Sequence, residues 1–433
     1  MNDSVRDYGE KPFIKYVADE EIITKSFKDA RDDALVASRH IRSITTDKKH
    51  IAIIGKTTYE FIIYYLGILA SGNVVVPIAP ETSASETADL IKMADVEMVI
   101  YDEQYSDRID EVKSLCPEIM GTINFSGNLE NAKEKYSATS EYASLSDIEI
   151  VKEDMCAIIY TSGTTGHAKG VCMTSINEVL SAHDVMIHFP MSYKDVTINT
   201  TPWFHRGGLH CAGPGPALYA GAAMVIMNKF DPLKTLKYVW RYKITFIIGV
   251  PTVLEALADE QERQGYDLQT LNGIVTMGSP LERSACIRYQ RVLTPNIFNG
   301  YGTTETFWNT FLRPFDLPEN AGTAGASCVD DDVRVVKVYE DHRAEPDDVI
   351  PTDSNEVGEV IICSPAKSPY IYYNNEEETE KKYYKEDCFN ESSILDFSIS
   401  GSIDLASSDL CTPKAILNLL STKSIFGFPI NIL

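Results

Sequence analysis

The sequence predicts an α/β protein with a largely parallel sheet that helices cover on both faces. Short runs rich in β-branched residues recur along the chain, and segments with a helical spacing of apolar residues lie between them. Strands that alternate with helices are typical of βαβ units. The chain has 433 residues, of which 44% are apolar and 24% charged. This is ordinary globular composition, and the length corresponds to roughly two or three structural units.

Seven runs have the composition of buried strands and justify the predicted sheet. A helix is expected directly after the first run, because Thr57 and Glu60 have the spacing of a capping box ahead of an apolar segment. Residues 252–264 and 281–293 also carry helical spacing, and a further helix is expected from about Ser175. The expected strands are Ile51–Ile54, Val74–Pro77, Met98–Tyr101, Ala157–Thr161, Ala222–Ile226, Thr245–Gly249 and Ile274–Met277.

The charge and the cysteines limit the classes of partner and compartment. The formal net charge is −24, so the surface repels phosphate backbones and anionic lipid, and nucleic acid is not an expected partner. Nine scattered cysteines without a Cys-x-x-Cys pair indicate a reducing compartment. The longest mostly apolar stretch, Phe61–Ala70, is too short to span a bilayer, and the first residues lack an apolar signal region. The sequence therefore predicts a soluble, cytoplasmic protein without a membrane span.

The segment Tyr160–Val171 is the most informative for chemistry. It follows a strand-like run and contains glycines, hydroxyl side chains and one lysine, a combination that suits a polyphosphate. The spacing differs from the Walker pattern, because Lys169 comes three residues after Gly166 and is followed by glycine. A flexible linker is the alternative interpretation. The residues predicted to bind phosphate are Thr161, Ser162, Gly163, Thr164, Thr165, Gly166 and Lys169.

With this signature the sequence resembles the adenylate-forming superfamily, which contains acyl-CoA synthetases, luciferases and the adenylation domains of peptide synthetases. Further blocks similar to those of the family follow in order, so that the resemblance covers roughly residues 12–386. The matching blocks are Leu66–Pro80, Pro202–His205 with the two glycines that follow, Gly249–Thr252, Met277–Leu281, Gly300–Glu305 and Gly358–Glu359.

The resemblance implies a fold and an activity. It implies the large N-terminal domain of the superfamily over residues 1–386, with layered subdomains at about 1–190 and 191–320 and a small β-rich subdomain at about 321–386. It further implies ATP-dependent activation of a carboxylic acid through an acyl-adenylate, followed by transfer to CoA, with Mg²⁺ as the metal. The expected partners are a small-molecule carboxylic acid, ATP and CoA.

Site roles also follow from the resemblance. Glu305 would bind magnesium, Thr304 would contact the α-phosphate, and Lys169 would act on the phosphates as a cation. Tyr301 would stack on adenine between two glycines that leave room for the ring. The predicted nucleotide-binding residues beyond the first loop are Gly278, Ser279, Pro280, Asn299, Gly300, Tyr301, Gly302, Thr303 and Thr304.

His205 is predicted to organise the substrate carboxylate at the mouth of the acyl pocket, as the matching family position does. A packed core position is the alternative for a histidine beside Trp203 and Phe204. Amino-acid-activating relatives carry Phe-Asp here, whereas this chain has Phe204-His205. The expected substrate is therefore a fatty acid or another acid without an α-amino group. Cys211 and Trp308 are expected in the core.

Residues 387–433 depart from the family pattern. They contain neither the Thr-Gly-Asp block nor the Gly-Arg hinge nor the catalytic lysine region of the family's small C-terminal domain, and they are rich in Ser, Ile and Leu. We hypothesise a frameshift or truncation near Asp387, which translation of the coding DNA in the other frames tests. The expected consequence is impaired activity. The alternatives are a non-catalytic nucleotide- or acyl-binding protein and a stand-alone amino-acid adenylation domain.

Overall fold

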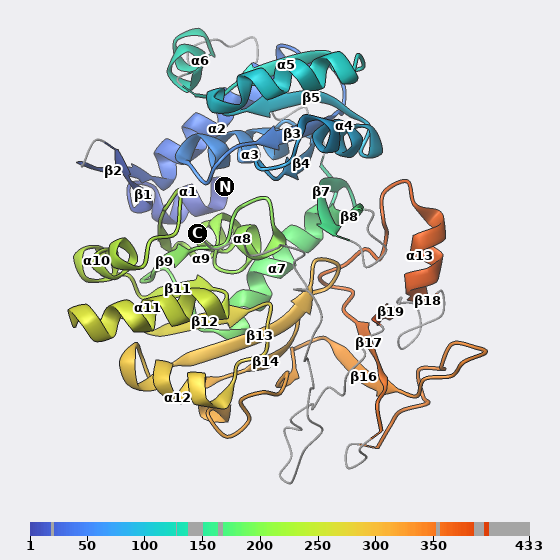
Figure 1. Cartoon of the computed structure of the whole chain (residues 1–433). Helices are drawn as coiled ribbons and strands as arrows, with labels where there is room; N and C mark the ends of the chain where they lie inside the picture. The colour runs from blue at the N-terminus through green and yellow to red at the C-terminus, as the bar shows by residue number, and fades with distance from the viewer. Residues whose placement is uncertain are drawn as a thin grey trace. The chain divides into compact units, whose positions relative to one another are not determined.

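The computed structural model describes residues 1–18, 21–126, 128–136, 150–162, 168–351, 356–384 and 394–397. The chain forms two compact units. The first contains residues 1–182, 191–229 and 372–374, and the second contains residues 183–190, 230–371 and 375–433. The predicted α/β class is confirmed, since helices alternate with strands in both units (Figure 1).

The first unit contains a six-stranded sheet in the order β6-β5-β3-β4-β7-β8. Its strands pair in parallel except for the antiparallel pair β7–β8. Helices α4 and α5 pack on one face, against side chains such as Ile54, Val76 and Val99. The strands of this sheet and the helices connected to them are α2 (Phe27–Arg42), β3 (His50–Ile54), α3 (Tyr59–Ala70), β4 (Val74–Ile78), α4 (Ala84–Met93), β5 (Val96–Tyr101), α5 (Ser106–Leu115), β6 (Gly121–Asn124), α6 (Asn128–Tyr136), β7 (Met155–Ser162) and β8 (Ala168–Thr174). Helix α7 (Ser175–His188) follows β8 and ends in the second unit, which begins at residue 183.

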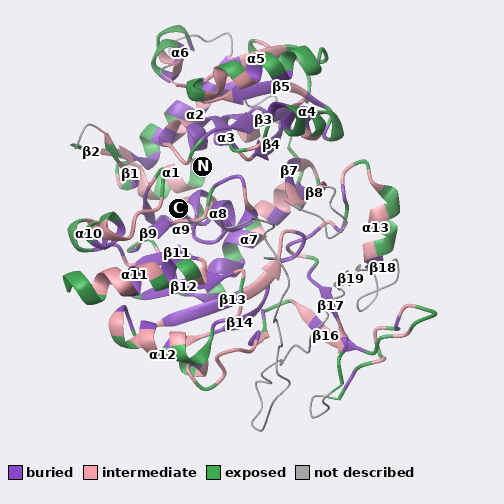
Figure 2. Ribbon diagram, viewed as in Figure 1, coloured by how far each residue is buried: buried purple, intermediate pink, exposed green. Residues whose placement is uncertain are grey.

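These strands are fully buried, which explains their continuous apolar sequence. Every residue from Val74 to Ile78 is buried, and so are Ile51–Ile54 in the neighbouring strand, as the buried colour of β3 and β4 shows (Figure 2). The first unit also contains α1 (Asn2–Tyr8) and four further strands in the order β9-β10-β1-β2, with two short helices. Their bounds are β1 (Pro12–Ala18), β2 (Glu21–Ser26), β9 (Val196–Asn199), α8 (Arg206–His210), α9 (Pro214–Ala220) and β10 (Ala223–Val225).

The second unit combines a mixed sheet with a small antiparallel sheet. Strands β11, β12 and β13 are parallel, and β14 and β15 continue the sheet in antiparallel pairing. The small sheet has the order β16-β17-β19-β18. The bounds are α10 (Pro232–Tyr242), β11 (Phe246–Gly249), α11 (Pro251–Gln264), β12 (Gly273–Met277), α12 (Arg283–Val292), β13 (Ile297–Thr303), β14 (Phe307–Leu312), β15 (Ala326–Ser327), β16 (Asp332–Val336), β17 (Glu359–Cys363), α13 (Glu376–Lys382), β18 (Tyr383–Tyr384) and β19 (Ile394–Phe397).

All seven expected strands form, but two local details differ from the prediction. The cap of α3 is Thr58, whose side chain accepts a hydrogen bond from the Phe61 amide, whereas Thr57 was expected to be the cap. Thr58 is the residue with extended backbone next to the helix, so its hydroxyl reaches the free amide. In addition, strand β8 lies between the phosphate-binding segment and α7.

Part of the divergent tail contributes to the second unit. Residues Ile394–Phe397 form β19, which pairs antiparallel with both β17 and β18. The other residues of 387–433 lie outside the described residues, and the frameshift hypothesis stays a prediction.

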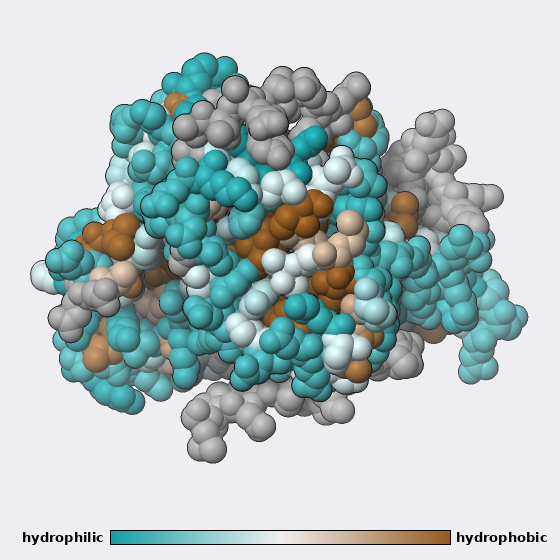
Figure 3. All heavy atoms as spheres, turned by 90° about the horizontal axis from the view of Figure 1, so that it is seen from above, coloured by the Kyte–Doolittle hydropathy of each residue, from teal (hydrophilic) through white to brown (hydrophobic). Residues whose placement is uncertain are grey.

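The surface is largely polar on the face shown in Figure 3, as expected from the many charged residues in the sequence. Hydrophobic side chains gather near the centre of that face (Figure 3). No helix among the described residues is long and apolar enough to cross a membrane. The seven cysteines in the described part of the chain are buried and free.

Candidate functional site

A glycine-lined pocket lies at the carboxyl ends of β12 and β13 in the second unit. These strands are parallel, and Met277 pairs with Gly300, so the residues after β12 lie beside the end of β13. Carboxyl ends of parallel strands are the usual ligand-binding edge of such sheets. The pocket has a volume of about 40 Å³, so it accommodates one edge of a flat ring. It is lined by Gly278, Ser279, Pro280, Asn299, Gly300, Tyr301, Gly302, Gly322, Thr323 and Ala324.

Seven of these ten residues were predicted from the sequence, and the structure brings them together. Gly322, Thr323 and Ala324 were missed. The sequence signal available for them was the run of small residues from Ala321 to Ala326, where Gly322 and Gly325 adopt positive φ angles of 96° and 89°. Such loops allow backbone to approach a ligand closely.

Tyr301 presents an unsatisfied polar atom in this region. Its hydroxyl is buried and has no hydrogen-bond partner within the described residues. Its ring packs against Ala324, Val333 and Val360, which fixes the side chain against the small sheet. Burial raises the pKa of Tyr301, and the nearby Glu305 carboxylate raises it further, so the hydroxyl stays protonated at neutral pH. The site therefore holds a buried donor that a polar ligand could satisfy.

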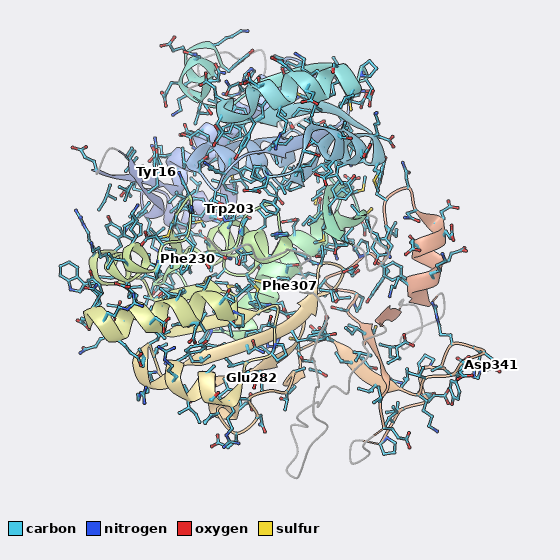
Figure 4. All side chains as sticks on the ribbon, viewed as in Figure 1. Tyr16, Trp203, Phe230, Glu282, Phe307 and Asp341 are labelled. Carbon is cyan, nitrogen blue, oxygen red and sulfur yellow. The ribbon has the colours of Figure 1, made fainter. Side chains whose placement is uncertain are left out.

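The strands β13 and β14 form a hairpin whose tip carries the predicted phosphate and metal residues. Thr303 pairs with Phe307, so that Thr304, Glu305 and Thr306 form the connecting turn, called the tip turn below. Phe307 begins β14 at the end of the hairpin (Figure 4) and has a φ of 62°. Gly302 is required here, because a Cβ atom at this position would lie 1.5 Å from the Phe307 carbonyl oxygen.

The donor set of the tip turn fits magnesium. The side chains of this turn and of the preceding Thr303 offer only carboxylate and hydroxyl oxygens, the ligands that Mg²⁺ prefers. Glu305 is 6% exposed, and its carboxylate acts electrostatically on Tyr301. A buried carboxylate close in sequence to the glycine-lined pocket is a suitable anchor for a hydrated metal ion.

A second cluster of ligand-type side chains is less suitable for a metal. Ligand atoms of Asp184, His188 and Cys328 lie within 4.8 Å of one another. However, the Arg313 guanidinium donates to His188 Nδ1 over 2.8 Å, and the Val329 amide donates to His188 Nε2 over 3.3 Å, so both ring nitrogens already face protein donors. The Lys367 ammonium also lies 3.4 Å from the Asp184 carboxylate. Protein cations therefore already balance this cluster.

The predicted phosphate loop belongs to the first unit. Gly163, Thr164, Thr165 and Gly166 lie outside the described residues, as does the side chain of Ser162. Thr161 on β7 pairs with Lys169 on β8, so the loop connects two antiparallel strands. Lys169 is 4% exposed, and its ammonium lies 5.3 Å from the ring centroid of Tyr372. A cation beside an aromatic face is held in a defined position.

His205 also lies in the first unit, where it precedes α8. Its ring centroid lies 4.2 Å from that of Phe204, and burial lowers the pKa of His205 to about 4. The imidazole is therefore neutral at pH 7. The neighbouring Arg206 and His210 are buried, and they contact Ser181 and Glu178 respectively.

The two residues expected in the core are both buried. Cys211 is 1% exposed and Trp308 is 2% exposed.

Comparisons with known proteins find similar sequences and a similar fold. A family model described as AMP-binding enzyme matches residues 1–369. The chain is 27% identical over 370 residues to a long-chain-fatty-acid–CoA ligase of Thermus thermophilus, covering 82% of this chain and 66% of that ligase. It is 28% identical over 223 residues to a feruloyl-CoA synthase of an Amycolatopsis species, covering 51% of this chain and 43% of the synthase. The chain thus spans less than two thirds of the length of these relatives.

A solved structure supports the fold. ATP-bound MatB from Rhodopseudomonas palustris matches with a TM-score of 0.75 at 20% identity, covering 90% of this chain and 74% of that chain. At this level of identity the match shows a shared fold.

Proposed function

The chain belongs to the AMP-binding enzyme family, and from that premise we propose that it uses ATP to activate a carboxylic acid through an acyl-adenylate, which then passes to CoA. One observation carries the proposal. The glycine-lined pocket and the tip turn lie on one continuous segment, Asn299–Thr306, so the residues expected to bind adenine and magnesium are a few positions apart in one hairpin. The names of the curated relatives, which are CoA ligases and synthases, agree with it.

The proposed reaction requires alignment and charge neutralisation. A carboxylate oxygen attacks the α-phosphorus of ATP and pyrophosphate leaves, so the site must hold the triphosphate in line and balance its charge. We expect the pocket to hold the adenine edge against Tyr301, and the Thr304 hydroxyl to donate to an α-phosphate oxygen. Magnesium, when bound at Glu305, would supply positive charge to the phosphates. Thr161 and Lys169 flank the loop expected to hold the β- and γ-phosphates.

The proposed substrate is a fatty acid or another acid without an α-amino group. Phe204 is followed by His205, which is neutral at pH 7, instead of a carboxylate that could pair with a substrate ammonium. A neutral imidazole can donate one hydrogen bond to a substrate carboxylate without forming a tight ion pair.

The turnover of this particular chain is expected to be slow. Residues 387–433 carry neither the ribose-binding carboxylate block nor the lysine region expected of the family. Loss of one preorganised charge or donor typically costs on the order of 100- to 1000-fold in rate. We therefore expect measurable but slow acyl-adenylate formation and little CoA thioester.

The test is acid-dependent exchange of labelled pyrophosphate into ATP. The purified chain is assayed with magnesium and a panel of fatty acids, hydroxycinnamic acids and amino acids, with Glu305→Gln as the matched inactive control. We expect exchange with at least one acid that lacks an amino group, and loss of exchange in the variant. Exchange with amino acids alone would instead support an amino-acid adenylation domain. ATP-induced stabilisation without exchange would identify a non-catalytic binding protein.

A further inference from the structure

A chain of hydrogen bonds connects the tip turn to a buried ion pair in the second unit. The Thr306 hydroxyl donates to Asn309 Oδ1 over 2.5 Å, and Asn309 Nδ2 donates to Asp331 Oδ2 over 3.0 Å. Lys367 donates to the same Asp331 oxygen over 2.7 Å. The sequence gives no sign of this connection, because its members are separated by up to 61 positions, from Thr306 to Lys367.

The hydrogen-bond network also includes Thr303, which precedes the tip turn. Thr306 Oγ1 lies 3.1 Å from Thr303 Oγ1, and the Thr306 amide donates to that same Thr303 oxygen. Since the only hydroxyl proton of Thr306 is directed to Asn309, the Thr303 hydroxyl donates to Thr306. The bonded pair Thr303 and Thr306 therefore encloses Thr304 and Glu305, the two residues of the proposed phosphate and metal site.

The end of this hydrogen-bond network at Asp331 and Lys367 is buried and held by further hydrogen bonds. The Lys367 side chain is 1% exposed and the Asp331 side chain 0% exposed, and Lys367 also donates to the carbonyl oxygen of Trp308. The Ser364 hydroxyl donates to the second Asp331 oxygen over 2.7 Å. Thr306 and Asn309 are both 0% exposed. Hydrogen bonds in such a dry environment keep their geometry, because water does not compete for them.

We propose that Thr306, held by Asn309, is a positioning residue that sets the orientation of Thr304 and Glu305 toward magnesium and the phosphates of ATP. The inference rests on the proposed function and deepens it. Thr306 need not touch the nucleotide, since its hydroxyl acts through the turn that it closes. Removing the hydroxyl leaves the glycine-lined pocket intact but frees the turn that carries the metal ligand. The effect is therefore specific for Mg–ATP relative to the nucleoside alone.

The first experiment compares three variants by calorimetric binding of Mg–ATP and of adenosine. Thr306→Val removes the hydroxyl at constant volume, Thr306→Ser retains it, and Thr235→Val is the matched control. Thr235 is also 0% exposed, and its hydroxyl donates to the Asp231 carbonyl in α10. We expect Thr306→Val to weaken Mg–ATP binding by about tenfold and adenosine binding by less than about twofold, with Thr306→Ser close to the wild type. Thr235→Val should lower the melting temperature without changing either affinity.

Equal losses of Mg–ATP and adenosine affinity in Thr306→Val would overturn the proposal, because they would indicate general damage to the fold. Unchanged Mg–ATP affinity would overturn it as well.

Asn309→Ala provides a second readout if Thr306→Val is unstable, and a double-mutant cycle tests the connection between the two residues where both variants fold. Asn309→Ala alone and the double variant with Thr306→Val are measured in the same way. If Thr306 acts through Asn309, the two losses of Mg–ATP affinity are not additive, whereas additive losses contradict the connection. These binding measurements do not depend on turnover. A wild-type chain that binds Mg–ATP but shows no acid-dependent exchange would refute the proposed function and still leave the positioning role open to this test.

Discussion

Replacing Gly302 by alanine tests whether the hairpin geometry creates the proposed nucleotide site. An alanine Cβ would lie 1.5 Å from the Phe307 carbonyl oxygen, whereas real Cβ contacts essentially never fall below 3.0 Å. The carbonyl would therefore have to move by about 1.5 Å, the difference between these two values. Phe307 cannot relax easily, because it already has a φ of 62° and closes the tip turn. We expect the free energy of unfolding to fall by about 4 kcal/mol or more.

Gly302→Ala should also lower the rate of acid-dependent exchange in the molecules that remain folded. A displacement on the order of 1 Å at a reacting site costs about 100-fold in rate, and the displaced turn carries both Thr304 and Glu305. Acid-dependent exchange and calorimetric Mg–ATP binding are measured below the unfolding transition. The matched control is Gly265→Ala at the end of α11, where φ is 66° and a Cβ would meet nothing within 4 Å.

The control separates backbone strain from steric clash. Gly265→Ala should cost only about 1–2 kcal/mol of stability, the penalty for a left-handed alanine, and should retain full exchange. A Gly302→Ala variant with wild-type stability and exchange would refute the conclusion that Gly302 and Phe307 define the tip turn. Loss of both stability and exchange in Gly265→Ala would show that the measurements report global unfolding.

Three further outcomes are expected. Lowering the pH from 7 to 5 should lower the free energy of unfolding by about 2 kcal/mol through His205. The pKa of His205 is about 4 in the folded state and 6.5 when exposed, so at pH 5 the unfolded chain binds a proton that the folded chain does not. Denaturant titrations should show that His205→Gln loses this part of the pH dependence, and an identical dependence would contradict the burial argument. Lys367→Met should destabilise the fold by about 3–5 kcal/mol by leaving buried carboxylates uncompensated, whereas Lys229→Met at an exposed position should have no measurable effect on the unfolding midpoint. Glu305→Gln should weaken ATP binding in the presence of magnesium far more than in its absence, and an equal loss under both conditions would exclude Glu305 as the metal ligand.

Much of the fold could be predicted from local sequence. The expected strands form because runs such as Val74–Ile78 are buried on both faces and contain mainly β-branched residues. Strand β8 was missed, because Lys169 and Gly170 interrupt its apolar pattern and its identity depends on pairing with β7. The cap of α3 was misplaced by one residue, because Thr57 and Thr58 are both suitable and only backbone geometry selects Thr58.

The candidate site also contains residues that the sequence predicted and residues that it did not. Its glycines and Tyr301 were predictable, because they lie in two short continuous segments with distinctive composition. Gly322, Thr323 and Ala324 were missed, because their only signal is a run of small residues, which has neither periodicity nor charge to mark it as a binding loop.

The sequence by itself determined the α/β class and indicated the segments expected to bind nucleotide and the chemical groups at Thr304 and Glu305, because each depends on neighbouring residues or on a repeated local pattern. The tertiary structure alone decided which side chains support those groups. Strand pairing and the turn after β17 bring distant segments together, and only for this reason does Asp331 accept hydrogen bonds from Asn309 and Lys367. The physical reason is that a buried charge or hydroxyl is stabilised by partners in space, and these partners are set by packing rather than by distance along the chain.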